Sequence, residues 1–373
     1  MNMNSFTPPD RILLGPGPSN VHPRVLEAMS RNTIGHLDPK FIELMDEIKQ
    51  LLKYSFQTKN DVTFAVSGPG SVGMETCLVN LIEPKTKVLV CINGVFGGRM
   101  KSIVERCKAE PIVLSFPWGK SIDPQTFEDT LKKNKGINLC SFVHAETSTG
   151  AKSNIKVLTE ISHKYNCVVV ADTVTSLGGI PVLIDEWNID ATYSGSQKCL
   201  SCPPGLSPVT FNEKAVELVK NRKTPVQSWF MDLNLILGYW SGSNKRTYHH
   251  TAPINSLYAL HEALLILKEE GIENSWKRHE INGKELISEL EKIGLSAFVD
   301  KNERLPQLTT IAVPDGVNEA NVRMSLLNDY NIEIGAGLGE LSGKVWRIGL
   351  MGYSSNKKNI DALLTALKEI LSN

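Results

Sequence analysis

Cys167-Val-Val-Val-Ala-Asp172 is the stretch that decides the fold, because it reads as a strand buried on both faces. Its apolar residues run on without the polar alternation of a half-exposed strand. Amphipathic segments such as residues 72–82 and 155–165 alternate with further short apolar runs. Those runs are residues 62–66, 87–92, 111–114, 138–143 and 190–193. This alternation predicts an α/β fold with a mostly parallel sheet covered by helices on both faces.

Asp172 ends its predicted strand, and Lys198 follows on a tight loop, Tyr193-Ser-Gly-Ser-Gln-Lys198. A lysine amine can hold an aldehyde as a Schiff base, and an aspartate can keep a pyridine nitrogen protonated. Only a protonated pyridine accepts carbanion electrons well. The two residues therefore predict a site for pyridoxal 5'-phosphate (PLP), with Lys198 and Asp172 as its catalytic residues.

Ser67-Gly-Pro-Gly-Ser-Val-Gly73 follows a predicted strand and opens a helix. Small residues let the backbone approach a phosphate, and a helix N-terminus supplies amide donors and a favourable dipole. The glycines also fit the G-x-G-x-x-G pattern of dinucleotide folds, but Pro69 removes an amide and no acidic residue ends the next strand to bind a ribose. A tight turn without a ligand is a third interpretation. Ligands of parallel sheets lie beyond the carboxyl ends of the strands, so this loop and Asp172 are expected to share one site.

Three further motifs admit both a functional and a structural interpretation. Phe96 follows a strand and offers a flat face for a pyridine ring, although a lone Phe is more often core. The hydroxyls of His144-Ala-Glu-Thr-Ser-Thr-Gly150 suit a cofactor, although Ser/Thr turns without a function are as frequent and His144 fits a structural role. In Tyr248-His-His-Thr251 the hydroxyls suit a phosphate, whereas adjacent histidines without partner ligands do not predict a metal site.

Arg347 lies in the apolar run Val345-Trp-Arg-Ile-Gly349, where a charged side chain needs a partner. One natural partner is the α-carboxylate of an amino acid, which the planar guanidinium binds with two nitrogens. A structural ion pair is the alternative.

The composition excludes several classes of protein. The 373 residues carry 40 basic and 40 acidic side chains, so bulk charge does not favour nucleic acid or a membrane surface. No apolar run approaches the roughly 18 residues that span a bilayer, and Met1–Asp10 lacks an apolar signal core. Seven cysteines in a chain of this length indicate reduced thiols and a cytoplasmic protein. Cys199 and Cys202 form a single C-x-x-C, which we interpret as incidental thiols rather than a metal or redox site.

The chain length predicts two domains behind an N-terminal arm. Residues 1–20 are the arm, since Gly15-Pro-Gly-Pro18 is too rigid and too broken for a helix. Asp38-Pro39 then opens a helix, with Asp as its cap. Residues 21–265 are expected to form the large PLP-binding domain, and residues 266–373 a smaller α+β domain with strands at 308–313 and 345–348 and a closing helix at 356–371. One long helical region over residues 254–290 is expected to bridge them.

Together these motifs resemble the alanine–glyoxylate/serine–pyruvate aminotransferase family, a class V group of fold-type I PLP enzymes. Their order and spacing carry the resemblance, which runs from about Arg11 to the final helix. The matching segments are Gly15–Ser19, Gly70-Ser71, His144–Gly150, Ala171–Gly179, Ser194–Lys198, Tyr248–Thr251 and Arg347–Gly349.

The resemblance implies a role for each matching residue. Lys198 resembles the Schiff-base lysine, Arg347 the arginine that binds the substrate carboxylate, and Gly17 part of the arm that closes over the substrate. Tyr248 and Thr251 match residues that reach the phosphate of the neighbouring subunit, which implies a homodimer with shared active sites. Phe96 and Ser71 stand where some relatives carry Trp and His. The implied cofactor-binding residues are Gly70, Ser71, Phe96, Thr147, Asp172, Val174, Gln197, Lys198, Tyr248 and Thr251.

The activity implied by the resemblance is transfer of an amino group from alanine or serine to glyoxylate or pyruvate, by a ping-pong mechanism through a Lys198 Schiff base. Small donors are favoured because no second arginine is evident for a distal carboxylate. A transaminase for a larger donor, of the 3-hydroxykynurenine or ureidoglycine type, stays open, as do a NAD-dependent dehydrogenase and a binding protein on the same fold. His36, in Ile34–Asp38, is a candidate for lining the pocket, and a structural role for it is equally open.

Overall fold

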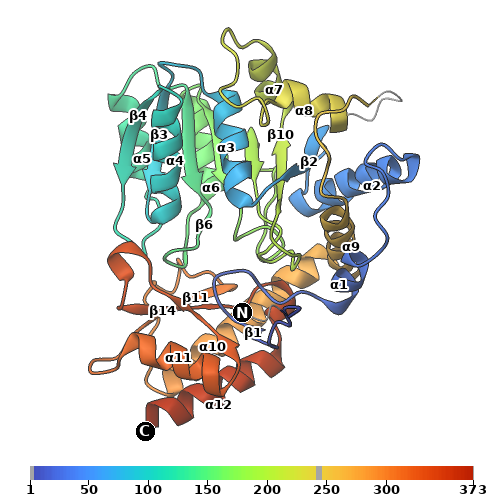
Figure 1. Cartoon of the computed structure of the whole chain (residues 1–373). Coiled ribbons are helices and arrows are strands. Elements are labelled where there is room, and N and C mark those ends of the chain that lie inside the picture. Colours follow the sequence, from blue (N-terminus) through green and yellow to red (C-terminus); the bar gives the residue numbers. More distant parts are fainter. Residues whose placement is uncertain (1–3, 241–245, 373) are drawn as a thin grey trace.

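The computed structural model describes residues 4–240 and 246–372, which fold around a seven-stranded sheet (Figure 1). The strand order is β2-β10-β9-β8-β5-β3-β4. Only β10 runs antiparallel, against β2 on one side and β9 on the other, which confirms the mostly parallel sheet. The strands are β2 (Val62–Ser67), β3 (Lys87–Ile92), β4 (Glu110–Ser115), β5 (Leu139–Val143), β8 (Val168–Asp172), β9 (Ala191–Tyr193) and β10 (Leu206–Phe211).

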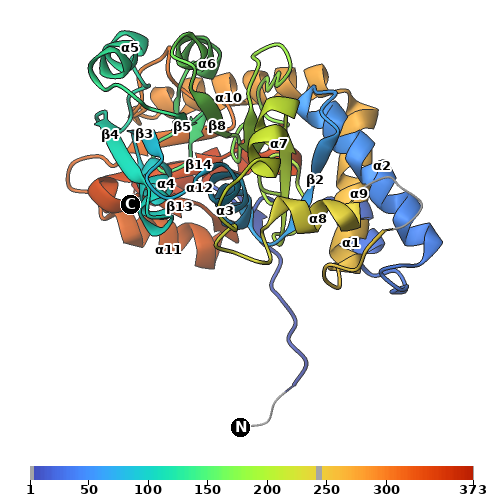
Figure 2. The same ribbon diagram turned by 90° about the horizontal axis from the view of Figure 1, so that it is seen from above.

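Helices cover both faces of this sheet, as the alternating pattern predicts. Seen from above, α3 (Gly70–Leu81) and α4 (Val95–Arg106) lie on one face, and α5 (Pro124–Lys133) and α6 (Ile155–Lys164) on the other (Figure 2). The strands of the sheet centre are therefore buried on both sides, and every residue of β5, β8 and β9 is buried. The surrounding helices are α1 (Pro23–Met29), α2 (Pro39–Phe56), α7 (Glu213–Lys220), α8 (Leu233–Trp240) and α9 (Ile254–Glu270).

The N-terminal segment behaves as its composition predicts. Residues 4–22 contain no helix and only the short strand β1 (Ile12–Leu13), which pairs in parallel with β12 (Ile332–Glu333). Helix α2 begins after Asp38, whose carboxylate accepts the Lys40 amide at 2.8 Å. The predicted cap and the proline at the first helical position are both confirmed.

The long helical region expected over residues 254–290 is confirmed, but it is divided into two helices. Helix α9 ends at Glu270 and α10 (Ile272–Lys292) begins two residues later, with Gly271 between them at φ 84°. That backbone conformation is in the left-handed region, which glycine adopts without a steric penalty. Apolar residues continue at helical spacing on both sides of Gly271, so the periodicity did not reveal the break.

The C-terminal part packs around a second hydrophobic cluster, separate from that of the large sheet. Its antiparallel sheet has the order β11-β14-β13 and lies beside α10, α11 (Glu319–Asp329) and α12 (Lys357–Ser372) (Figure 1). Leu14 of the N-terminal arm joins this cluster. The remaining elements are β6 (Ala145–Glu146), β7 (Ala151–Lys152), β11 (Leu308–Ala312), β13 (Gly335–Ala336), η1 (Gly339–Leu341), β14 (Val345–Gly349) and η2 (Gly352–Ser354).

Two distinct cores fit the predicted two domains, while the exact boundaries of that division stay a prediction. In residues 4–240 and 246–372, no helix combines the length and apolar composition needed to span a bilayer.

Candidate active site

Asp172 lies at the carboxyl end of β8, directly beside the last residue of β9. One carboxylate oxygen accepts the hydroxyl of Tyr193 at 2.8 Å, and the other accepts the amide of Val174 at 2.8 Å. The side chain is only 2% exposed, and this burial raises the pKa of Asp172 to about 6, against the opposing effect of both hydrogen bonds and of the Lys198 charge. Tyr193 is a site residue that the motif analysis missed, because it reads as an ordinary strand aromatic.

Lys198 lies in the loop after β9 and is 8% exposed. Its amine donates to the carbonyl of Pro16, and Ser19 of the same arm donates to the Lys198 carbonyl at 2.8 Å. A Cβ on Gly17 would lie 2.8 Å from the lysine nitrogen, so the arm approaches this closely only because Gly17 has no side chain. Burial, together with the charge of Arg347, lowers the pKa of Lys198 to about 8. The amine is therefore partly unprotonated near neutral pH.

The glycine loop meets the lysine loop at the N-terminus of α3. A Cβ on Gly70 would contact Val174 at 3.4 Å and Gly195 at 3.7 Å, so these backbones converge. The N-cap residue, Pro69, gives the helix no side-chain cap. Beside it, the side-chain oxygen of Gln197 is buried and has no hydrogen-bond partner among the described residues. The uncapped amides at the start of α3 form a cradle that suits an oxyanion, and Gln197 could add a donor only through its side-chain nitrogen, because its unpaired oxygen is an acceptor.

Ser71, Phe96 and Arg99 lie next to this cradle. Arg99 donates to the hydroxyl of Ser71 at 2.7 Å, and its guanidinium carbon lies 4.9 Å from the centroid of the Phe96 ring. The sequence analysis did not identify Arg99. The sequence could have identified Arg99 by its position, because a residue three positions after Phe96 lies on the same face of α4.

Arg347 projects from β14 toward the same region from the C-terminal part of the chain. Its Nε donates to the carbonyl of Ala336 at 2.7 Å, and its Nη1 to the carbonyl of Thr147 at 3.0 Å. Within residues 4–240 and 246–372 it forms no ion pair with a carboxylate, so the structural ion pair left open by the sequence is not found there. Burial lowers the pKa of Arg347 to about 10, against the charge of Glu146. The hydroxyl of Thr147 bonds Thr175 rather than facing open space.

Glu146 is a second residue that the motif analysis missed. It is fully buried, and one carboxylate oxygen accepts the amide of Ser148 at 3.0 Å and its hydroxyl at 2.5 Å. Ser148 in turn accepts the amide of Val95, at the start of the helix that carries Phe96. Burial raises the pKa of Glu146 to about 7. The sequence could have pointed to Glu146, because an acidic side chain is unusual in a buried, hydroxyl-rich loop.

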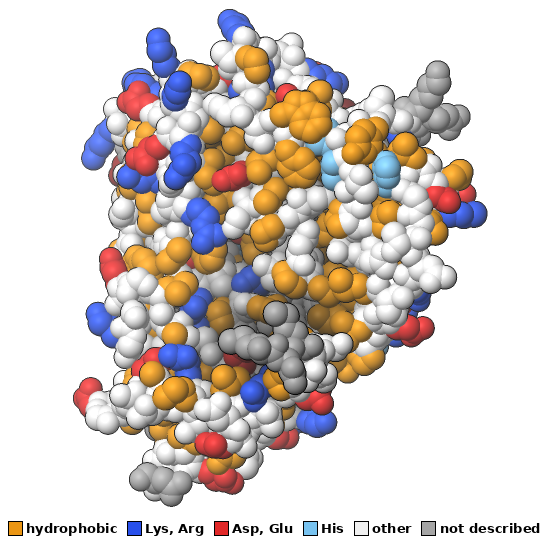
Figure 3. All heavy atoms as spheres, in the orientation of Figure 1, with side chains coloured by type: hydrophobic (Ala, Val, Ile, Leu, Met, Phe, Trp, Pro, Cys, Tyr) orange, Lys and Arg blue, Asp and Glu red, His pale blue; other side chains and the backbone are white. Residues whose placement is uncertain are grey.

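In the single chain, Tyr248 and Thr251 lie away from the Lys198 pocket. Tyr248 is 62% exposed, its hydroxyl lies 3.5 Å from that of Thr251, and its ring lies 5.2 Å from His36. His36 therefore contacts this surface rather than the surroundings of Lys198. Hydrophobic side chains gather there beside the pale-blue histidines in the upper right of Figure 3, and Trp229 is 63% exposed.

The remaining candidates do not add chemistry to the site. His144 is buried against Trp187, and burial lowers its pKa to about 3, which fits the structural interpretation. Cys199 and Cys202 are free and buried, and burial raises the pKa of each thiol to about 12. Such thiols are unreactive.

The topology does not favour the dinucleotide interpretation of the glycine loop. In that fold the loop follows a central strand of a parallel sheet. Here it follows β2, which lies at the sheet edge and pairs only with the antiparallel β10.

Comparison with known proteins agrees with this geometry. The profile of the family described as Aminotransferase class-V matches residues 12–363. The chain is 43% identical over 365 residues to alanine–glyoxylate aminotransferase of Rattus norvegicus, which covers 97% of this chain and 88% of that protein. It is 36% identical over 381 residues to (S)-ureidoglycine–glyoxylate transaminase of Bacillus subtilis, covering 97% of this chain and 91% of that protein.

Solved structures extend the likeness to three dimensions. Alanine–glyoxylate aminotransferase from Nostoc sp. superposes with a TM-score of 0.97 at 46% identity, covering 100% of this chain and 98% of that one. Ureidoglycine–glyoxylate aminotransferase from Bacillus subtilis has a TM-score of 0.96 at 37% identity, covering 99% and 95%. These findings do not favour a dehydrogenase. The chain belongs to the class-V aminotransferases, whose membership implies a PLP-dependent enzyme of fold type I.

Proposed function

We propose that this aminotransferase moves the amino group of alanine or serine to glyoxylate or pyruvate, with PLP held by Lys198. The observation that carries the proposal is the convergence of three groups: the buried Lys198 amine, the Asp172 carboxylate held by Tyr193 of the strand before the lysine loop, and the Arg347 guanidinium bonded to the Thr147 carbonyl. A buried amine, a carboxylate and a guanidinium are the groups that an amino-acid transaminase requires. Relatives named alanine–glyoxylate aminotransferase, with 43% and 46% identity, support alanine as donor and glyoxylate as acceptor.

The residues present fit PLP. The uncapped N-terminus of α3 at Gly70 and Ser71 would hold its phosphate, with the side-chain nitrogen of Gln197 as a further donor. Asp172 would hold the pyridine nitrogen, and Phe96 would pack on the ring. When bound, PLP supplies a ring that accepts electrons from the substrate Cα. Asp172, with a pKa of about 6, is ionised at neutral pH and so can keep a proton on the ring nitrogen.

Lys198 would move the proton of the reaction. Its nitrogen would take the proton from the substrate Cα as general base and later release it as general acid. A pKa of about 8 suits both roles, because it lies close to neutral pH. The Gly15–Pro18 arm covers this amine and would exclude water from it.

Arg347 would bind the α-carboxylate of the donor. Its two bonds to backbone carbonyls fix the plane of the guanidinium, and Nη2 makes no hydrogen bond within the described parts of the chain. Arg99, another arginine near the site, is bonded to Ser71 on the phosphate side rather than free to bind a distal carboxylate. Small donors therefore suit the pocket better than dicarboxylic ones.

We further propose a cytoplasmic homodimer in which Tyr248 and Thr251 of each chain complete the phosphate site of the other. The exposed Tyr248 and Trp229 support a buried interface here, since large aromatic side chains are enriched at such contacts. Light scattering on the purified protein measures the mass directly, and a monomer at micromolar concentration would reject the shared site. Seven free cysteines are consistent with a reducing compartment.

Visible absorption of the PLP-loaded protein tests the function. We expect the band of the bound cofactor to decay when alanine or serine is added and to return with glyoxylate or pyruvate. A band that responds only to ureidoglycine or 3-hydroxykynurenine would keep the aminotransferase but reject the small donor. A protein that stays colourless after PLP is added would reject the assignment of Lys198.

A further inference from the structure

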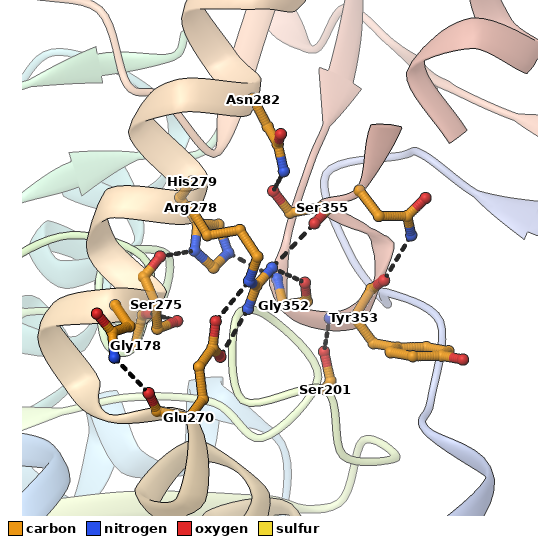
Figure 4. A network of polar contacts seen from close by, with 12 residues as sticks. Gly178, Ser201, Glu270, Ser275, Arg278, His279, Asn282, Gly352, Tyr353 and Ser355 are labelled. Carbon is orange, nitrogen blue, oxygen red and sulfur yellow. Dashed lines mark hydrogen bonds and ion pairs between the residues drawn. The ribbon is translucent and has the colours of Figure 1, made fainter. Parts of the chain in front are cut away.

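A polar network joins the beginning of α10 to two other segments (Figure 4). One of them carries Lys198, and the other follows the strand that carries Arg347. One segment is the lysine loop, in which Ser201 donates its amide to the Lys198 carbonyl at 3.0 Å. The other is Gly352–Ser355, which follows the strand of Arg347. Ser201 and the Gly352–Ser355 segment lie outside the pocket described above, but each follows a residue of it in the chain.

The two segments touch each other directly. The hydroxyl of Ser201 accepts the amide of Tyr353 at 2.6 Å. A Cβ on Gly352 would lie 1.9 Å from that hydroxyl oxygen, so only glycine permits the contact. Movement of the Gly352 segment is therefore transmitted to the lysine loop.

Two consecutive side chains of α10 hold the backbone of Gly352 from the other side. Arg278 donates to its carbonyl at 2.7 Å and to the carbonyl of Ser355 at 3.0 Å. The amide of Gly352 donates to His279 at 2.8 Å, and the other ring nitrogen of His279 bonds the carbonyl of Ser275 at 2.7 Å. His279 is fully buried, and burial lowers its pKa to about 3, so it is neutral and free to accept this bond.

The network is also anchored to the large sheet. Glu270, at the end of α9, accepts two bonds from Arg278 at 2.6 and 2.9 Å. Ser275 donates to the carbonyl of Gly178 at 2.8 Å, in the segment that follows Asp172. The start of α10 thus bonds the segments that follow Asp172 and Arg347, and it reaches the lysine loop through the Ser201–Tyr353 bond.

We propose that Arg278, Glu270 and His279 are positioning residues that set the spacing between Lys198 and Arg347. This inference rests on the proposed function, in which one donor places its amine at the cofactor on Lys198 and its carboxylate at Arg347. Both groups are bonded to the same carbon, so the spacing tolerates little error. A misplacement of about 1 Å costs on the order of a hundredfold in such oriented reactions. The network therefore selects α-amino acids over amines that lack the carboxylate.

The test compares alanine with ethylamine, which is the same amine without its carboxylate. Each is titrated into PLP-loaded protein, and its apparent affinity is read from the visible band of the cofactor. In Arg278→Gln we expect the apparent affinity for alanine to fall by about tenfold or more. The affinity for ethylamine should change by less than about twofold, since only alanine engages both Lys198 and Arg347. Glu270→Gln should act in the same direction with a smaller effect.

Arg323→Gln is the matched control. Arg323 also forms a two-pronged pair, with Glu319, and its side chain is 29% exposed against 31% for Arg278. That pair lies within α11 and contacts neither the lysine loop nor Gly352. A loss of melting temperature similar to that of Arg278→Gln, with alanine affinity unchanged, is the expected control result.

Equal weakening of alanine and ethylamine in Arg278→Gln, or an alanine effect in Arg323→Gln of the same size, would overturn the proposal. If Arg278→Gln does not fold, Arg278→Lys keeps the charge and one bond, and the same discrimination between alanine and ethylamine is expected at reduced size. A wild-type protein whose band ignores alanine would instead reject the proposed function, and this inference with it.

Discussion

The Lys198 pocket and the surface around Tyr248 and Trp229 differ in how many of their contacts a single chain provides. Around Lys198 the charged groups are buried, and their partners come from the same chain, from segments as far apart as Pro16 and Arg347. Tyr248 and Trp229 are more than half exposed and contact histidines at the surface. The contrast fits the proposed dimer, in which the proton chemistry is internal to a chain and a second copy completes the phosphate site.

The largest expected effect is loss of the internal amine. Lys198→Ala should lower the rate of amino transfer by about 10²- to 10⁴-fold, because it removes the general base and acid. The subunit mass should not change, since Lys198 is remote from the Tyr248 surface. Single-turnover kinetics with alanine measure the rate, with the exposed Lys156→Ala as control. A near wild-type rate would show that another group moves the proton.

Asp172→Asn tests the charge that faces the ring nitrogen. The substitution keeps the shape of the side chain but removes its charge and replaces one acceptor oxygen with a donor, so kcat should fall by roughly 10- to 100-fold. The KM for alanine should stay nearly constant, because Arg347 still binds the carboxylate. Steady-state kinetics separate the two parameters. A kcat within about twofold of wild type would contradict the role of Asp172.

Sequence reasoning identified what is local and missed what requires distant contacts. Asp172 and Lys198 follow apolar runs whose ends could be located from the chain alone, and a parallel sheet brings such ends to one edge. Tyr193 and Glu146 lie within the quoted motifs and Arg99 lies outside them, but their side-chain roles depend on contacts that only the fold brings together. The strand β10 was missed because its buried run, Leu206-Ser-Pro-Val-Thr-Phe211, contains a proline that usually argues against a strand within a sheet.

Arg347→Gln should weaken substrate binding and little else. Losing a charged hydrogen-bond pair with the carboxylate costs about 2 kcal/mol, or roughly 30-fold in the KM for alanine. The affinity for PLP should be unchanged, because Arg347 approaches the site from β14. PLP titration of the variant is the control, and a KM equal to that of wild type would assign the arginine to a structural role.

The pH dependence of cofactor attachment follows from the lowered pKa of Lys198. Only the unprotonated amine attacks the aldehyde, so the rate of PLP attachment to PLP-free protein should rise with pH and level off above about 8. Below that pH the rate should fall roughly tenfold per unit. Stopped-flow absorbance measures it. A rate still rising at about pH 10 would place the pKa of Lys198 near the usual value for lysine.

The smallest effect is expected at the exposed surface. Tyr248→Phe removes one hydroxyl from the proposed partner contact and should weaken PLP binding by about two- to tenfold. The rate of proton transfer in the saturated protein should not change, since the Lys198 pocket is intact. Equilibrium PLP titration gives the affinity, and an unchanged affinity would remove Tyr248 from the phosphate site.

The most direct measurement locates the cofactor on the chain. Borohydride reduces the C=N bond between PLP and its lysine to a stable C–N bond, and peptide mass spectrometry then identifies the modified residue. We expect the label on Lys198 in the wild-type protein and no label at this peptide in Lys198→Ala. A label on a different lysine, or none after incubation with PLP, would contradict the assignment of this pocket as the active site.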